Sequence, residues 1–346
     1  SSEQATQIIN TLSADASVPF SPEYIHSLTP ASSEGIDIFI DGGNAPLFSS
    51  NALFIDYQKI AIVCYLHQKR VSIIEIPYLV ILQNQSDEQS LSITLLEDEL
   101  VSFHSAVYRN DEESYLGSSM VTTCNEFLKQ FGTTDFLKYC HQSEVDLTHL
   151  EQVAQSVRYY LEQEVALTLS SQKQKNVEKD LTIFLDGALL APASRLSSLP
   201  DNFDANKRIS FVGFCKTTDL LADTGEPAAL AVGSFVQEQV RVTRPWHYAP
   251  LFTFSERASC IAMAKLHPHA KHVFRIDFLT SAQKRFTETV SSLCSYANDP
   301  VFIGYPYPLI EVDKHARISN QTISNMKTHL HFLLQQHGLD KVLSYE

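Results

Sequence analysis

The sequence predicts an α/β protein in which a mixed sheet is flanked by helices. Three observations support this class: apolar β-rich runs separated by turns, a long stretch with helical spacing, and a second series of strand-like and helical segments. A chain of 346 residues is long enough for one large domain or two modest ones. Hydrophobic residues make up 44% and charged residues 19%, which excludes a wholly disordered chain.

The first quarter of the chain is expected to form an arm followed by a three-stranded antiparallel meander. Residues 1–35 are rich in Pro, Ser and Ala, which is typical of an N-terminal arm. The apolar run Ile36–Ile40 predicts a buried strand that stops at a turn, Asp41-Gly42-Gly43. The β-rich runs Asn51–Leu66 and Arg70–Leu82 predict the remaining two strands, joined as a hairpin.

The middle of the chain combines an insertion, a helix and two strands. Residues 83–140 are mixed and polar, and we expect an insertion of helices and loops there. Apolar residues recur every three to four positions over Leu147–Leu169, which predicts an amphipathic helix. A short apolar strand, Leu181–Leu185, then ends in Asp186-Gly187, and Ile209–Phe214 predicts the next strand.

Four further elements complete the predicted domain, which spans residues 36–319. They are a strand over Leu230–Val242, a helix over Ser255–Leu266, a strand over Val273–Leu279 and a helix over Ala282–Tyr296. A proline-rich stretch follows at Asp299–Asp313. Residues 320–346 are expected to form a C-terminal helical extension, with its helix stopped by Gly338.

Composition excludes several classes of function. The net charge of −14 argues against a protein that coats nucleic acid unaided, and only 11 glycines make glycine-rich phosphate loops unlikely. No apolar run reaches the length of a membrane span, and the first residues do not resemble a signal peptide. Six scattered cysteines without metal-ligand spacing predict reduced thiols in a cytoplasmic protein.

Basic residues are concentrated in one segment, between Arg241 and Arg285. Eight Lys and Arg residues stand there against two acidic residues. Three aromatic residues and four histidines are interleaved with them: Trp246, Tyr248, Phe252, His247, His267, His269 and His272. The segment is interpreted either as a wall that contacts phosphates or as solvated surface, and the last three histidines are interpreted as a solvated loop around Pro268.

Two predicted strands end in the same way, with Phe39-Ile40-Asp41-Gly42 and Phe184-Leu185-Asp186-Gly187. An aspartate at the carboxyl end of a buried strand has a fixed backbone and a side chain that projects into the cleft above the sheet. Asp-Gly is also a common turn, so one copy alone would carry little weight. Glu162 or Glu164 on the intervening helix would complete a site for Mg²⁺ or Mn²⁺, which prefer oxygen ligands.

The order of these elements resembles that of the NurA nuclease family. Three segments resemble its motifs: Gly304–Asp313 is similar to the family's YPYPL-x-x-A-D/H segment, Phe211–Thr218 to its G-x-x-K-T/S strand end, and Arg158–Glu162 to its R-x-x-x-E helix. The resemblance runs from about Ile36 to Ser319. It implies that the mixed sheet has an RNase H-like fold.

The resemblance also implies roles for individual residues. Asp41, Glu162 and Asp186 would bind Mn²⁺ or Mg²⁺, and Lys216 would lie near a phosphate. Either Tyr305 or Tyr307, together with Asp313, would complete the pocket. Two departures stand out. Gly43 occupies a position where the family often has serine. Asp313 stands where some members have histidine, with His315 two residues later.

The resulting hypothesis is a metal-dependent deoxyribonuclease that hydrolyses phosphodiester bonds. The resemblance implies a homodimer that receives DNA from a hexameric HerA-type ATPase, in DNA end processing and repair or in defence against phage. A second hypothesis is a catalytically inactive adaptor that loads DNA onto an ATPase. A third, an actin-like enzyme that uses ATP, is disfavoured because neither Asp-Gly strand leads into a glycine-rich loop.

Overall fold

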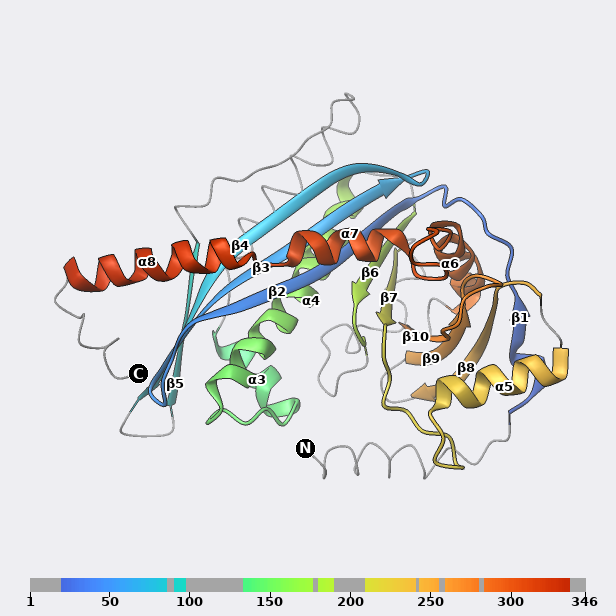
Figure 1. Cartoon of the computed structure of the whole chain (residues 1–346), viewed down its shortest axis with the longest axis horizontal. Helices are drawn as coiled ribbons and strands as arrows, with labels where there is room; N and C mark the ends of the chain where they lie inside the picture. The colour runs from blue at the N-terminus through green and yellow to red at the C-terminus, as the bar shows by residue number, and fades with distance from the viewer. Residues whose placement is uncertain are drawn as a thin grey trace.

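A computed structural model of the chain describes residues 20–85, 90–97, 133–176, 180–189, 209–240, 243–254, 259–279 and 283–336 (Figure 1). Its strands are β1 (Ile25–Ser27), β2 (Ile36–Ser49), β3 (Leu53–Leu66), β4 (Lys69–Gln85), β5 (Ser90–Glu97), β6 (Leu181–Asp186), β7 (Ile209–Cys215), β8 (Trp246–Phe254), β9 (Ser259–Lys265) and β10 (Phe274–Leu279). Its helices are the short 3₁₀-helix η1 (Pro22–Tyr24) and the α-helices α3 (Thr133–Gln142), α4 (Leu150–Asn176), α5 (Ala228–Val240), α6 (Gln283–Tyr296), α7 (Tyr307–Ala316) and α8 (Asn320–Gln336).

The described strands form one mixed sheet in the order β1-β8-β9-β10-β7-β6-β2-β3-β4-β5. Its centre consists of the antiparallel meander β4-β3-β2, followed by β6 and β7, which run parallel to β2. The chain passes from the meander to β6 through helix α4 (Figure 1). This is the RNase H-like arrangement, so the predicted fold class is confirmed.

The central strands are buried on both faces, and for this reason their sequences are nearly continuous hydrophobic runs. Ile38 and Ile40 of β2 belong to the core that contains α4, whereas Phe39 between them belongs to the core that contains α6 and α7. The β3–β4 hairpin closes through His67 and Gln68, whose positive φ angles of 50° and 64° suit a two-residue hairpin turn. The predicted meander and hairpin are confirmed.

The predicted turn at Asp41-Gly42-Gly43 is wrong, because β2 continues through these residues to Ser49 and pairs with β3 along the way. Both glycines lie where another part of the chain approaches the strand. A side chain on Gly42 would collide with the Glu162 carboxylate, and one on Gly43 would collide with the Ala316 carbonyl oxygen. The two glycines therefore serve close packing within a strand. The same contact explains why serine does not follow Gly42 here.

Two element types in the second half were predicted wrongly. Leu230–Val242 was expected to be a strand, but Ala228–Val240 is helix α5, in which Ala228, Val232 and Val236 are buried at a spacing of four residues. Ser255–Leu266 was expected to be a helix, but it contains β9, which is buried on both faces and therefore lacks alternation.

Other differences concern where elements begin and end. The insertion predicted over 83–140 is not only helices and loops, since β4 extends to Gln85 and β5 pairs with it, while residues 98–132 lie outside the described residues. The proline-rich stretch contains the start of α7, where Pro308 in the first turn needs no hydrogen-bond donor. Ile25–Ser27 of the predicted arm pairs with β8, a strand that was not predicted.

The remaining predicted elements are confirmed as α4, β6, β7, β10, α6 and α8. Helix α4 continues beyond its predicted end at Leu169 to Asn176, and the other shifts at element ends are small. Helix α4 packs against β2, β3, β4 and β6 on one face of the sheet, and α7 packs against β2 and β3 on the other. Helix α8 continues beyond α7 over the far end of the long meander (Figure 1). Among the described residues, no helix combines the length and the apolar character that a membrane span requires.

Candidate active site

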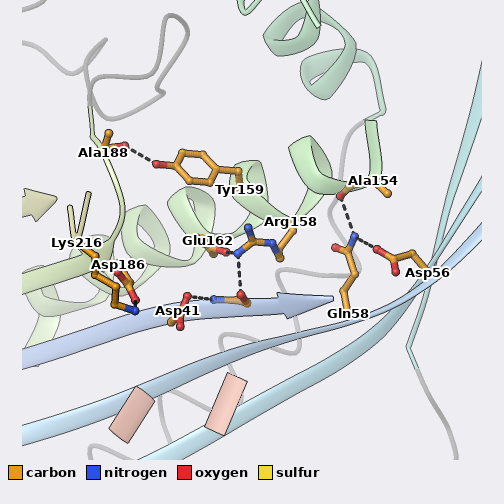
Figure 2. Close-up of polar contacts among 11 residues, drawn as sticks. Asp41, Asp56, Gln58, Ala154, Arg158, Tyr159, Glu162, Asp186, Ala188 and Lys216 are labelled. Atoms are coloured by element: carbon orange, nitrogen blue, oxygen red, sulfur yellow. Dashed lines mark hydrogen bonds and ion pairs between the residues drawn. The ribbon is translucent and has the colours of Figure 1, made fainter. Parts of the chain in front are cut away.

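Asp41 lies on β2 and is buried, with 8% of its surface exposed. Its Oδ1 accepts a hydrogen bond of 2.8 Å from the Gly42 amide (Figure 2). Burial is the largest influence on this carboxyl, and the negative charges of Glu162 and Asp186 add to it, so that the pKa of Asp41 rises to about 7. Asp41 is therefore a buried carboxyl group close enough to Glu162 and Asp186 to be affected by their charges.

Glu162 reaches β2 from helix α4 and is 1% exposed. Its carboxylate lies against Gly42, and the Arg158 Nη1 donates both to Glu162 Oε1 at 2.6 Å and to the Gly42 carbonyl at 2.7 Å (Figure 2). Burial is the main reason that the pKa of Glu162 rises to about 7, against the opposing effect of Arg158. Of the two glutamates left open by the sequence, Glu162 is the one that lies against β2, whereas Glu164 is partly exposed.

Asp186 ends β6, next to Asp41 in the sheet, because Leu185 pairs with Ile40 in parallel register. The Phe39 and Phe184 rings stack with centroids 4.7 Å apart, so the aspartates two residues later project from the same face. Asp186 Oδ2 is 2.5 Å from Lys216 Nζ (Figure 2). Burial is the largest cause of the raised pKa of Asp186.

Lys216 follows the end of β7, which pairs with β6 in parallel. Its Nζ lies 5.6 Å from the centroid of the Tyr305 ring, and its side chain is 44% exposed. Lys216 thus stands at the carboxyl end of the parallel strands, with its amino group between an aspartate and the solvent. A cation in this position suits a phosphate ligand.

Tyr305 lies in the segment before α7 and is the next member of this group of residues. Its ring packs edge-on against the Phe214 ring, with the ring centroids 5.5 Å apart. Its hydroxyl oxygen is buried and has no hydrogen-bond partner in the part of the chain that the structure describes. Burial, followed by the charges of Asp186, Asp41 and Asp313, raises the pKa of Tyr305 far above its usual range. A buried, unpaired hydroxyl facing carboxylates is a natural place for a ligand.

The sequence left open which residue of α7 approaches this site. Asp313 lies near enough to raise the pKa values of both Asp186 and Tyr305, and it accepts a hydrogen bond of 2.5 Å from Arg317. His315 instead bonds Glu75 Oε1 through Nδ1 at 2.7 Å. Asp313 is therefore the candidate that faces the carboxylates.

Ion pairs, ring contacts or electrostatic effects link six of the predicted site residues: Asp41, Glu162, Asp186, Lys216, Tyr305 and Asp313. Tyr307, the alternative to Tyr305, is 46% exposed at the start of α7. Sequence reasoning gave no role to Arg158 or Tyr159. The signal for Arg158 was its position one helical turn before Glu162, which places the two side chains together.

Helix α4 is fastened to the strands on both sides of the site. Arg158 binds the Gly42 carbonyl beside Asp41, and Tyr159 Oη donates to the Ala188 carbonyl at 2.5 Å, just after Asp186 (Figure 2). Further along, Gln58 Nε2 on β3 donates to the Ala154 carbonyl of the helix at 2.8 Å. These bonds hold α4 in place against the strands and so fix the position of Glu162 relative to Asp41 and Asp186.

The predicted phosphate-contacting wall is wrong for its aromatic part. Trp246 and Tyr248 of β8 are buried in the core next to α5. Arg275 is also engaged, since it donates to both carboxylate oxygens of Asp277 at 2.7 and 2.8 Å. These residues support the fold. In the loop around Pro268, His269 and His272 are exposed and His267 is partly exposed.

The donor set fits a hard divalent cation, since all three inner side chains are carboxylates. In the described residues, no three Asp, Glu, His or Cys side chains form a ready-made metal site, and Arg158 and Lys216 each take one carboxylate oxygen. Burial is the main cause of the raised pKa values of Asp41, Glu162 and Asp186, and a neighbouring carboxylate adds to the shift of each. Asp41, Glu162 and Asp186 are thus the residues that could hold such an ion.

No protein-family model matches the chain, and no curated protein matches it. Among solved structures, it is similar to the NurA nuclease from Sulfolobus solfataricus, with 12% identity and a TM-score of 0.46 over 97% of this chain and 95% of that one. It is also similar to the catalytic domain of human Endonuclease V, with 10% identity and a TM-score of 0.36 over 97% and 99%. A third match is Ciona intestinalis Endonuclease V in complex with DNA, with 12% identity and a TM-score of 0.33 over 84% and 90%. Similarities at this level assign no activity, so the function is argued from the site.

Proposed function

We propose that this chain is a metal-dependent deoxyribonuclease that hydrolyses phosphodiester bonds at the edge formed by β2, β6 and β7. The observation that carries the proposal is the mutual electrostatic influence of three buried carboxylates, Asp41, Glu162 and Asp186, the last of which is paired with Lys216. Burying acids together is costly unless a cation neutralises them. Such an arrangement is typical of a site built to hold Mg²⁺ or Mn²⁺ and a phosphate rather than of a structural core.

The carboxylates Asp41, Glu162 and Asp186 would hold the divalent cation. When bound, such a cation lowers the pKa of water and neutralises charge on a phosphodiester. Lys216, whose amino group is paired with Asp186 and partly exposed, would bind a non-bridging phosphate oxygen. The unpaired hydroxyl of Tyr305 would donate a hydrogen bond to the phosphate and orient it for in-line attack. Asp313 would complete the outer side of this pocket.

We further propose that the enzyme works as a cytoplasmic homodimer with a hexameric HerA-type ATPase, in DNA end processing, repair or defence against phage. The sequence motifs imply these partners. The net charge of −14 supports them, because delivery of DNA by a motor removes the need for tight unaided binding. Light scattering tests the homodimer, and co-purification tests the partnership with the ATPase. A stable monomer that does not bind the ATPase would contradict both.

One observation favours a second candidate function, a non-catalytic adaptor that loads DNA onto an ATPase. Arg158 and Lys216 already neutralise Glu162 and Asp186, as they would in a purely structural ion-pair network. An adaptor of this kind would bind DNA and its ATPase but would show no Mn²⁺ binding that depends on Asp186.

Cleavage of end-labelled linear DNA in Mn²⁺, Mg²⁺ or EDTA tests the proposed function. We expect shortening that requires the metal and that falls by about 100-fold or more in D186N. The matched control is D180N, because Asp180 stands just before β6 and forms an ion pair of 2.6 Å with Arg285. Equal cleavage by D186N and D180N would refute the proposal. If the wild type is inactive alone, the assay is repeated with the ATPase present.

A further inference from the structure

Two loops extend the candidate active site along the same edge of the sheet. Strand β10 begins beside the end of β7, since Arg275 pairs with Cys215, so the β9–β10 loop (residues 266–273) lies at the edge that carries Lys216. The α6–α7 loop (residues 297–306) leads into Tyr305. The two loops touch, because Gly304, with a φ of 88°, packs against Ala270.

The α6–α7 loop holds apolar side chains out into solvent. Val301, Phe302 and Ile303 are 77%, 50% and 44% exposed, and Tyr307 just after the loop is 46% exposed. The backbone between them is fixed: Asp299 Oδ1 accepts from the amides of Val301 and Phe302 at 2.8 and 3.1 Å. The Gly304 amide donates to the Ala297 carbonyl at 2.9 Å. A fixed, exposed apolar group of this kind marks a contact surface.

The β9–β10 loop adds basic and hydrogen-bonding side chains to this apolar group. His269, Lys271 and His272 are exposed, and no acidic residue occurs between 266 and 273. The acidic residue of the other loop, Asp299, accepts hydrogen bonds from the amides of Val301 and Phe302 through Oδ1. On a chain with a net charge of −14, the β9–β10 loop thus carries a lysine and no carboxylate next to an exposed apolar and aromatic loop.

We propose that these two loops bind the single-stranded end of a DNA substrate. The binding surface consists of Val301, Phe302, Ile303, Tyr307, His269, Lys271 and His272. Bases would stack on the Phe302 and Tyr307 rings, and Lys271 would contact the backbone phosphates. Unpaired bases suit this surface because their faces are free to stack, whereas those of duplex DNA are covered. The inference rests on the proposed function and names its substrate as a strand with unpaired bases.

The surface is continuous with the active site. The His272 and Phe274 rings are 6.3 Å apart, and Phe274 contacts Tyr305 at 5.7 Å. Tyr305 in turn lies under Lys216. A strand lying over the two loops would therefore pass its backbone toward Lys216 and the carboxylates.

Binding of a fluorescent oligothymidine to the full chain, measured by anisotropy in EDTA, tests the proposal without cleavage. We expect F302A to weaken binding about tenfold, the order of effect expected when one base–aromatic contact is lost. The control is F332A on α8, since Phe332 is 54% exposed and lies on a different element. K271A is expected to lower the slope of log affinity against log salt by about 0.7, and K327A on α8 to leave it unchanged.

Equal affinity of F302A and F332A for the oligonucleotide would overturn the inference. So would a wild type that binds duplex but not single-stranded DNA. If F302A keeps its affinity for DNA but changes the oligomer size in light scattering, the surface is a protein interface instead. D186N in the cleavage assay tests the proposed function separately, because the anisotropy assay contains no divalent cation.

Discussion

At Gly42, the absence of a side chain lets the Glu162 carboxylate lie against the backbone of β2. We predict that G42A displaces this carboxylate, lowers Mn²⁺ affinity at least tenfold and costs about 1–3 kcal/mol of stability. Calorimetric titration and urea denaturation measure the two effects. G233A in α5 is the control: its new methyl would make only an ordinary contact with Val273, so it should be neutral or slightly stabilising.

Glu162 also makes stability depend on pH. Its pKa rises to about 7 in the folded protein, mainly through burial, so between about pH 4 and pH 7 the folded state holds a proton that the unfolded state releases. The free energy of unfolding should therefore fall as pH rises through this window and level off above it. We predict that E162Q removes roughly 3 kcal/mol of this dependence, as measured by urea denaturation at pH 5 and pH 8.

The exposed carboxyl of Glu144 provides the control, and E144Q should follow the wild-type pH profile. The variant E162Q should retain the contribution of Asp41, whose pKa rises to about 7, and the smaller contributions of Asp37 and Asp56, whose pKa values burial raises to about 6. A wild type whose stability increases from pH 5 to pH 8 would contradict this reading of the site.

Helix α4 acts at the scale of an element, because consecutive residues tie it to both aspartate-bearing strands. Arg158 is mostly buried and pairs with a carboxylate that is 2% exposed, whereas the Lys138–Asp135 pair on α3 is exposed. We predict that R158A costs on the order of 3–5 kcal/mol, since it leaves a buried charge alone. The exposed pair should contribute less than about 1 kcal/mol, so K138A is the control in urea denaturation. Similar losses in both variants would show that Arg158 does not support the site.

Helices and strands were predictable where the sequence period of their apolar residues matches the way the element is buried in the fold. The meander, α4 and β6 each carry one clear period or one short apolar run, and the structure confirms them. Helix α5 was predicted as a strand and β9 as a helix because each contains a nearly continuous apolar run, and period alone cannot decide the type of such a run. The start of α7 was hidden by prolines that its first turn tolerates.

For the whole molecule, the sequence allowed prediction of the RNase H-like centre but not of the outer strands β1, β5 and β8, which depend on long-range pairing. The acidic residues of the site were predictable because each follows or accompanies a recognisable element. Lys216 was also predicted, but the bonds of Arg158 to Gly42 and of Lys216 to Asp186 were not, since they join residues far apart in sequence. The two-glycine strand likewise became intelligible only with α4 and α7 in place.

The central claim is that carboxylates from three separate elements act as one cation site. Titration of the whole protein with Mn²⁺, followed by electron paramagnetic resonance, tests it most directly because no substrate or partner is needed. We predict that the wild type and D180N bind Mn²⁺ with the same affinity, and that D41N, E162Q and D186N each bind at least tenfold more weakly. A wild type that binds no Mn²⁺, or a D186N variant that binds as tightly as D180N, would contradict the account.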